Sequence, residues 1–472
     1  MEPSRKIERK QFYKMLIAIA VPVAFQNLLA TTGSMVDTVM LARLGENTVG
    51  AIGLCAQFSS LMFSCYWGFV GGGMLFMSQR WGAKDGDGVC SAHGMTFSFL
   101  FMVGLIFGIL AFAFPGMVMS MYTDKEVLRD IGGQYLRIVG FAYPLQVASM
   151  AISALLRSTE RVRLPLIASV ASIFTNILFN YLLIFGKLGL PCMGVRGAAL
   201  ATVISAVVNL AVLMILGKVQ KHPYLWKFRA HFRWTKRDFK DYLAKCFPII
   251  CNELLIGVGN MVINIVLGRQ STQAIAALAV FRTFEGFVIS FFAGFTNAAS
   301  ILIGKEVGAG NHELAFTRAK RLILLTPCVV LAACLIFLCF LKPFLNVMSL
   351  TGEAASICRY LILLYTLIVP IRMTNWINND SFRAAGNPIF GTVLEIIFMY
   401  ALVLPAVILS GVVFHAPFLI VFVCTFCDEP IRVFIILREM LSGRWIRPVT
   451  PEGQRTIGTF REAHHIQVKE RG

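Results

Sequence analysis

The sequence predicts an all-α integral membrane protein with twelve transmembrane helices in two pseudo-symmetric six-helix bundles. Three observations lead to this fold class: the composition is strongly apolar, long apolar segments recur along the chain, and residues repeat at an offset of about 226. Each half has an even number of spans. Both halves therefore enter the membrane from the same side, as in transporters built from parallel repeats.

The composition excludes an ordinary soluble protein. The 472 residues are 57% hydrophobic and 14% charged, and the mean hydropathy is +0.72. Soluble domains contain about 45–50% apolar and about 25% charged residues. The charged start of the chain runs into an apolar segment without a small-residue cleavage motif, so we expect no removed signal peptide. The twelve cysteines are scattered singly, which is typical of free thiols.

Apolar runs bounded by charged residues, glycine and proline predict the twelve spans. Their ranges are 14–42, 48–78, 92–115, 127–156, 164–186, 195–217, 242–268, 272–303, 318–341, 354–380, 388–410 and 416–440. Residues 1–217 thus form an N-terminal six-helix lobe, and residues 242–441 form a C-terminal one. A basic, aromatic linker over 218–241 joins them, and a basic tail covers 442–472. Both are expected in the cytoplasm.

The basic residues indicate the orientation in the membrane. With the N-terminus inside, 31 of the 43 Lys and Arg lie on the inner side and nine lie in the outer loops. Cytoplasmic loops are enriched in basic residues, so we expect both termini in the cytoplasm of a multi-pass protein of the plasma (inner) membrane. The net charge of +18 therefore reflects topology. We expect contact with membrane lipids and no nucleic-acid partner.

Residues that match at one offset of 226 reveal an internal repeat. The pairs are Pro22 and Pro248, Arg43 and Arg269, Ala51 and Ala277, Gly82-Ala83 and Gly308-Ala309, Pro144 and Pro370, and Arg157 and Arg383. Seven matches, several at predicted helix ends, indicate a duplicated six-helix unit. Two such bundles around a central cavity favour a carrier that opens alternately to each side.

Polar side chains in the first half predict a cation site. Asp37 lies in the first span, and Asn176 and Asn180 share one face of the fifth span. Thr202 lies in the sixth span, and it shares with Asp37 and Asn180 a depth of about 9–10 Å below the outer helix ends. Their oxygens suit Na⁺, and a proton would suit the carboxylate equally. The alternative is hydrogen bonding between helices alone.

Glu253 is a second candidate because it lies about 17 Å into the seventh span, near the membrane midplane. Its repeat counterpart is Asn27, so the halves are not electrically equivalent. Glu253, Asn27 and Gln26 are candidates for binding a cationic substrate or a proton. Alternatively, the acid ties helices together.

Other intramembrane charges are interpreted as structural. Arg282 and Glu285 are three residues apart on one helix face, and a compensating cluster is expected from Asp428, Glu429 and Arg432. No HExxH, Walker A or GxSxG motif is present. We therefore expect no enzyme, no catalytic residue, no cofactor and no metal other than Na⁺ at Asp37. An ion gradient is then the expected energy source.

Several segments resemble the multidrug and toxic compound extrusion (MATE) family in its bacterial form. They are MVDTVMLARLG, GGGMLFMSQRWGAKD, LLRSTERVRLP and NILFNYLLIFGKLGLPCMGVRGAALATVIS, with weaker forms in GKEVGAGN and FRAAGN. The resemblance covers about 14–440. It implies twelve helices in two lobes and export of organic, often cationic and amphipathic compounds in exchange for Na⁺ or H⁺. It also places Asp37, Asn176, Asn180 and Thr202 at the N-lobe cation site.

The chain departs from the family pattern at a few positions. Asn180 stands where an archaeal-type pattern has Asp. Glu253 follows Pro248 by five residues, whereas the sodium-coupled branch places its acid about eight residues after this proline. That branch also carries an acid on its tenth helix, where this chain has Arg372 and Asn375.

We therefore expect a monomeric secondary active multidrug antiporter whose Met- and Phe-rich cavity accepts varied small organic molecules. Two alternatives stay open. A lipid-linked saccharide flippase of the same superfamily would need a strongly basic cavity. A polytopic membrane enzyme, which is disfavoured, would need a catalytic cluster at one face of the membrane.

Overall fold

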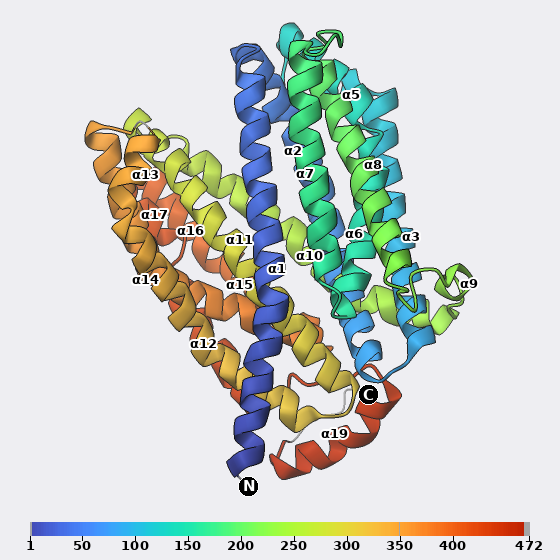
Figure 1. Ribbon diagram of the computed structural model, residues 1–472. Coiled ribbons are helices and arrows are strands. Elements are labelled where there is room, and N and C mark those ends of the chain that lie inside the picture. The colour runs from blue at the N-terminus through green and yellow to red at the C-terminus, as the bar shows by residue number, and fades with distance from the viewer. Residues whose placement is uncertain (1, 349, 467–472) are drawn as a thin grey trace. The chain divides into compact units, whose positions relative to one another are not determined.

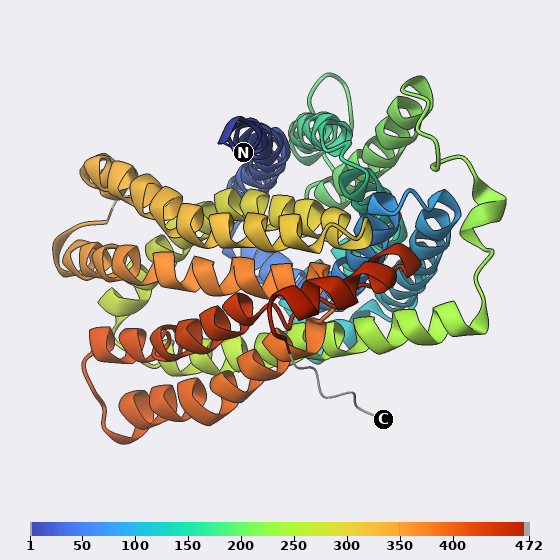
Figure 2. The ribbon, with the colours of Figure 1, turned by 90° about the horizontal axis from the view of Figure 1, so that it is seen from below.

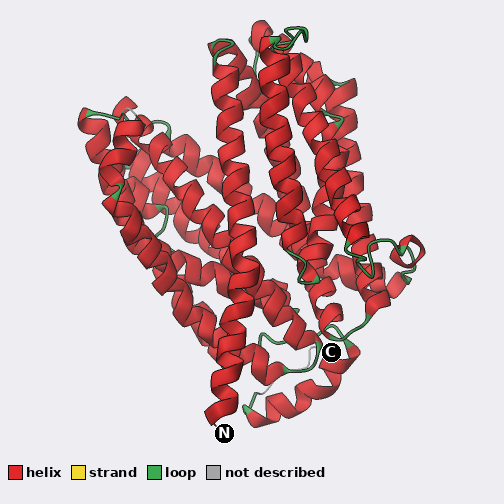
Figure 3. Ribbon diagram, in the orientation of Figure 1, coloured by secondary structure: helices red, strands yellow, loops and turns green. Residues whose placement is uncertain are grey.

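The computed structural model describes residues 2–348 and 350–466, and every regular element among them is helical (Figure 3). The first half contains α1 (Glu2–Ala42), α2 (Glu46–Gly82), α3 (Gly86–Ala113), α4 (Pro115–Ser120), α5 (Glu126–Val139), α6 (Ala142–Ser158), α7 (Arg163–Phe185) and α8 (Val195–Val219). Then come α9 (Phe228–His231), α10 (Lys236–Leu267), α11 (Thr272–Gly308), α12 (His312–Cys339), α13 (Leu341–Val347) and α14 (Gly352–Ala384). The chain ends with α15 (Pro388–Phe398), η1 (Met399–Val403), α16 (Leu404–Ile408), η2 (Leu409–Val413), α17 (Phe418–Cys424), α18 (Glu429–Ser442) and α19 (Pro451–Ala463).

All twelve predicted spans coincide with helical segments. Ten described helices are long and apolar enough to cross a membrane, and an eleventh span is the α5–α6 pair, which bends by 49°. The twelfth range is divided between α17 and α18, which are separated by a turn over 425–428 and are each too short alone. Several helices, including α1 and α11, extend beyond the predicted spans. Apolar runs mark only the lipid-facing part of a helix, whose backbone hydrogen bonds continue into polar sequence.

The helix boundaries confirm the repeat. The start of α2 lies 226 residues before the start of α11, and the ends of these two helices are separated by the same offset. The same is true of α3 and α12. The start of α5 is also 226 residues before the start of α14, and the end of α6 is 226 residues before the end of α14. The equivalent of the α5–α6 bend is continuous helix in α14, so the halves share topology but not every detail.

The chain divides into two compact units. The N-terminal unit comprises Phe25–Met77 and Asp85–Ile250, and the C-terminal unit comprises Ser78–Lys84, the residues up to Ala24 and those from Cys251 onward. Both have large exposed apolar side chains, such as Leu61 and Ile106 in the first and Leu324 and Phe434 in the second. Their surfaces are those of a protein solvated by lipid, where only helices or closed barrels satisfy the backbone.

The linker between α8 and α10 is built into the N-terminal unit. Its short helix α9 packs against α3 (Figure 1). A Cβ atom at Gly94 would overlap the carbonyl group of His231, so glycine is needed for this close approach. The His231 Nε2 donates to the Tyr224 carbonyl at 3.0 Å. The linker is therefore a packed element as well as a connection.

His222 anchors the start of this linker in a neutral form. Its Nδ1 accepts from the backbone amides of Tyr224 and Leu225 at 3.4 and 3.3 Å, so the proton lies on Nε2, 2.9 Å from the Thr159 hydroxyl. Burial, and secondly the charge of Arg161, lowers the pKa of His222 from 6.5 to about 4. Protonation of Nδ1 would remove both accepted hydrogen bonds.

The fold is therefore expected to lose stability in mild acid. Below about pH 6.5 the unfolded chain binds a proton at His222 that the folded protein binds only near pH 4, so the free energy of unfolding falls as the pH decreases through this window. At pH 5 the loss from this residue is about 2 kcal/mol. The free energy of unfolding, measured with denaturant at pH 7 and at pH 5, should decrease less in His222→Gln than in the native protein. The exposed His415→Gln is the control, and an equal loss in all three proteins would contradict the assignment.

The C-terminal segment folds back on the C-terminal unit, although only a basic tail was expected from the sequence. The Gln79 side chain donates to the Ala384 carbonyl at 2.7 Å and accepts from the Val449 amide at 2.8 Å. The Thr450 hydroxyl, at the start of α19, donates to the Gly308 carbonyl at 2.7 Å. These contacts tie the ends of α2, α11 and α14 together, and Figure 2 shows α19 lying across the unit.

Candidate functional site

Three of the four predicted cation ligands meet in the N-terminal unit. Asp37 lies on α1, and Asn180 Nδ2 on α7 donates to its Oδ1 at 2.6 Å. In the orientation that satisfies the carboxylate, the Asn176 amide nitrogen lies 2.7 Å from the same oxygen. Asn180 is buried, and its Oδ1 has no partner among the described residues. A half-buried carboxylate and a free amide oxygen thus share one site, which suits a small hard cation or a proton.

Thr202 does not bond to Asp37. Its hydroxyl donates to the Ala198 carbonyl, 3.0 Å away on the same helix, as hydroxyls in apolar helices commonly do. Its neighbour from another helix is Tyr135 of α5. Tyr135 was not predicted from the sequence, where its only signal was a polar hydroxyl in a predicted span. The structure therefore adds a phenol to the surroundings of the site.

An apolar cluster lies about one turn beyond these polar residues. Leu41 follows Asp37 by four residues, and Ile184 follows Asn180 by four. Both are buried against Ala198, and Tyr135 and Ile52 pack around them. This cluster excludes water from one end of the site, which strengthens electrostatic interactions at the carboxylate.

Gln26 and Asn27 also lie on α1, nearer to its N-terminal end than Asp37. The Gln26 amide is held from both sides: Nε2 donates to Ser169 Oγ at 2.7 Å, and Oε1 accepts from Arg157 Nη2 at 3.0 Å. The half-buried side chain of Asn27 makes no hydrogen bond to another described residue. Gln26 is therefore a positioned polar group, whereas Asn27 is available to a ligand.

Glu253, in the C-terminal unit, is paired. Arg383 Nη1 lies 3.4 Å from its Oε1 and 3.7 Å from Asp380 Oδ1. The Glu253 side chain is 32% exposed. The structure therefore gives Glu253 a counter-ion that residue spacing did not predict, although Arg383 was identified from the sequence as a repeat residue.

The remaining intramembrane charges of the C-terminal unit form one chain of ion pairs, as expected for Arg282, Glu285 and the α18 cluster. Arg282 and Arg372 both contact Glu285, at 2.5 and 2.6 Å. Arg372 also lies 3.8 Å from Glu429, which is 2.9 Å from Arg432. Arg432 continues to Asp428 and Glu395 at 3.2 and 3.8 Å. With Glu253, Asp380 and Arg383, these ion-pair networks hold six carboxyl and four guanidinium groups.

The Asp37 site has no counterpart in the second repeat. At the offset of 226, Ile263 stands where the first half has Asp37, and Ala406 stands where it has Asn180. Among the described residues, no group of three or more His, Cys, Asp or Glu side chains could hold a metal ion. The pair of Asp37 and Asn180 is thus specific to the first repeat.

Comparisons with known proteins agree with this architecture. The family model MatE matches residues 22–182 and again 248–409, and the starts of these two ranges are separated by the repeat offset. An uncharacterized transporter of Bacillus subtilis, YisQ, is 22% identical over 92% of this chain and 95% of its own. A probable multidrug resistance protein of Thermotoga maritima, NorM, is 23% identical over 93% and 94%. An outward-facing structure of a multidrug resistance MATE family transporter superposes with a TM-score of 0.81 at 16% identity, covering 95% and 96%.

Proposed function

Because the chain belongs to the multidrug and toxic compound extrusion (MATE) family, we propose that it is a secondary active transporter that exports small amphipathic organic compounds, often cationic, by antiport with Na⁺ or H⁺. The related proteins named as multidrug resistance or multidrug export proteins support this substrate class. In this proposal the protein lies in the plasma membrane with both termini in the cytoplasm, and it works as a monomer.

The observation that carries the proposal is the Asp37 carboxylate held by two amides inside apolar helices. Ionisable groups in membrane spans are costly and mark ion pathways. The carboxylate, the free Asn180 Oδ1 and the nearby Thr202 and Tyr135 hydroxyls offer oxygen ligands. Binding of the coupling ion there would favour one orientation of the transporter, and its release would favour the other.

The C-terminal networks support a secondary role in proton binding. They contain two more carboxyl than guanidinium groups, so full ionisation would leave two uncompensated negative charges within these networks. Glu253 is the most accessible candidate, since its side chain is 32% exposed. The paired arginines also argue against the flippase alternative, because each neutralised guanidinium is less available to a pyrophosphate.

Efflux driven by an imposed gradient tests the proposal. Proteoliposomes loaded with a fluorescent cationic dye are given an inward Na⁺ gradient or an inward H⁺ gradient. We expect one of the two gradients to accelerate dye efflux over protein-free vesicles, and a protonophore to abolish the effect only for H⁺. No acceleration by either gradient would contradict the antiport mechanism.

A further inference from the structure

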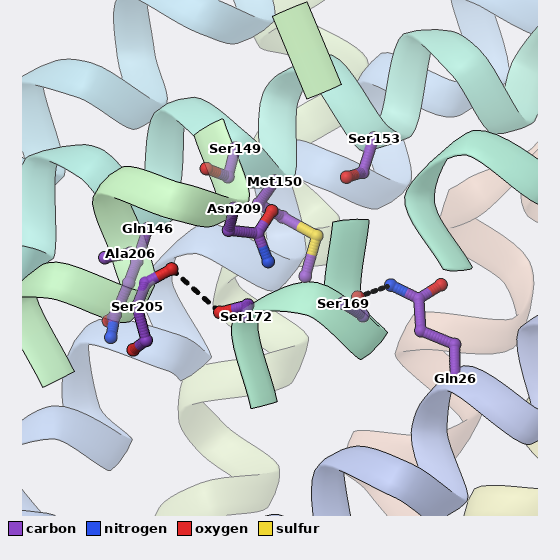
Figure 4. Close-up of a pocket in the computed structure, with 10 residues that line it drawn as sticks. All are labelled: Gln26, Gln146, Ser149, Met150, Ser153, Ser169, Ser172, Ser205, Ala206 and Asn209. Atoms are coloured by element: carbon purple, nitrogen blue, oxygen red, sulfur yellow. Dashed lines mark hydrogen bonds between the residues drawn. The ribbon is translucent and has the colours of Figure 1, made fainter. Parts of the chain in front are cut away.

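An apolar groove runs along an exposed side of α3 in the N-terminal unit. Its volume is about 370 Å³, and its lining comes from residues of α3 between Phe97 and Ile109 and from Phe232 of the linker. Ser98 is the one polar residue of this lining, and its hydroxyl donates to the Gly94 carbonyl of its own helix at 2.8 Å. The pocket between α6, α7 and α8 is different, because five serines and three side-chain amides line it (Figure 4). The groove is therefore suited to an apolar chain.

The length of the groove matches one leaflet of a membrane. Phe97 and Ile109 are twelve residues apart on α3, which is about 18 Å along the helix axis. The hydrocarbon core of a bilayer is about 30 Å thick, so one leaflet contributes about 15 Å. Helix α3 is long and apolar enough to cross a membrane, and Met102 and Ile109 in the groove are 49% and 58% exposed. The groove thus opens toward lipid and has room for an acyl chain.

The linker closes one end of the groove with an aromatic side chain. Phe232 directly follows α9, which packs against α3 (Figure 1). The preceding residue, His231, is buried, and its ring lies 4.7 Å from the ring of His93 on α3. The Phe232 ring itself is 61% exposed. Packing within the protein therefore fixes the backbone at Phe232, while its ring stays open to an external partner.

The linker is strongly basic at this end of the groove. Arg229 and Arg233 flank Phe232 in the sequence, and neither forms an ion pair with another described residue. Trp226 and Trp234 are 40% and 36% exposed on either side of them. Interfacial tryptophans and clusters of four to eight basic residues next to a membrane helix are typical of contact with anionic lipid headgroups. Between positions 226 and 237 there is no acidic residue, and the exposed cations are Lys227, Arg229, Arg233, Lys236 and Arg237.

The corresponding segment of the second repeat differs at these positions. Helix α19 packs against α12, as α9 packs against α3. At the offset of 226, Gly458 stands where the linker has Phe232, and Thr459 stands where it has Arg233. Helix α19 also carries the exposed acids Glu452 and Glu462. The aromatic end of the groove and the surrounding excess of cations are thus specific to the N-terminal unit.

We propose that this surface binds one anionic phospholipid, with an acyl chain in the groove of α3 and the phosphate group at Arg229 and Arg233. Guanidinium groups match the geometry of phosphate oxygens and can donate two parallel hydrogen bonds to them. A zwitterionic headgroup carries its own cation, which the basic linker would repel. The inference rests on the proposed function only for the side of the membrane, since the linker would then meet the cytoplasmic leaflet.

Native mass spectrometry of the full-length protein, released from detergent micelles, tests this proposal. Delipidated protein is titrated with palmitoyl-oleoyl phosphatidylglycerol or with phosphatidylcholine of the same chains. We expect the first phosphatidylglycerol molecule to bind about thirtyfold more tightly than phosphatidylcholine, the effect of two basic residues on an anionic lipid. Arg229→Ala combined with Arg233→Ala should remove most of this preference.

The matched control is Arg129→Ala combined with Arg137→Ala. These two arginines are also exposed and belong to the same unit, but they lie on α5. Their replacement should leave the lipid preference unchanged. Gel filtration should show that both double variants remain folded.

The groove is tested separately with Phe232→Ala. Loss of the aromatic ring should weaken the binding of both lipids about fivefold, because it removes apolar contact that does not depend on the headgroup. Phe174→Ala is the control, since the Phe174 ring on α7 is 69% exposed and does not line the groove. Both variants should elute from gel filtration as the native protein does.

Equal affinity for the two lipids would overturn the proposal, as would a preference that survives substitution of both linker arginines. Equal effects of Phe232→Ala and Phe174→Ala would overturn the placement of the acyl chain. The result is separable from the antiport mechanism, because lipid binding is measured without a gradient. Gradient-driven dye efflux without a lipid preference would overturn only this inference. A lipid preference without gradient-driven efflux would overturn only the proposed function.

Discussion

Asp37→Asn is expected to reduce gradient-driven dye efflux to the rate of protein-free vesicles while the protein remains folded. The substitution preserves the shape of the side chain and its contacts with Asn176 and Asn180, which lie 2.7 and 2.6 Å from Oδ1. It removes the negative charge that would bind Na⁺ or release a proton. A ligand changes an equilibrium only through differential affinity for the two states, so a site that no longer binds the ion cannot drive transport.

The measurement is the initial rate of dye efflux under the gradient that drives the native protein. Asp130→Asn, an exposed acid on α5 of the same unit, is the matched control and should retain the native rate. Gel filtration and thermal melting of both variants should match the native protein. Native efflux by Asp37→Asn would show that the coupling ion binds elsewhere, with Glu253 as the next candidate.

Arg372→Met is expected to cause a large loss of stability in the C-terminal unit. The guanidinium group lies 2.6 Å from Glu285 and 3.1 Å from the Tyr365 hydroxyl, with the Trp376 and Phe426 rings 5.3 and 5.2 Å away. The Arg372 side chain is 18% exposed and that of Glu285 is 5% exposed. Removal of one partner leaves a buried acid undercompensated, at a cost of about 3–5 kcal/mol.

Unfolding of the purified protein in mixed micelles by added sodium dodecyl sulfate measures this loss. Arg282→Met is the matched control, because Arg282 contacts the same acid but its side chain is 44% exposed. Exposed ion pairs contribute about 0–1 kcal/mol. The double variant with Glu285→Gln should recover part of the stability lost by Arg372→Met. Equal losses for the two arginine variants would contradict the importance of burial.

Much of the candidate site could be derived from residue spacing. An α-helix has a fixed rise per residue and places residues four apart on one face, so the common depth of Asp37 and Asn180 followed from counting. The structure brings them within 2.6 Å. The same reasoning could not show that Thr202 bonds to its own helix, because depth along a helix says nothing of the direction in which a side chain points.

The sequence by itself determined the helical membrane architecture, the duplicated halves and the family. Lipid requires every backbone hydrogen bond to be made within a span, so apolar run length is nearly sufficient to identify the helices. The internal repeat and the family resemblance can be recognised from the order of the residues alone. Only the tertiary structure decided that Glu253 is paired with Arg383 and that residues 448–463 pack on the C-terminal unit. These outcomes depend on how each helix is rotated about its axis and on how large side chains fill space between helices, which no local pattern encodes.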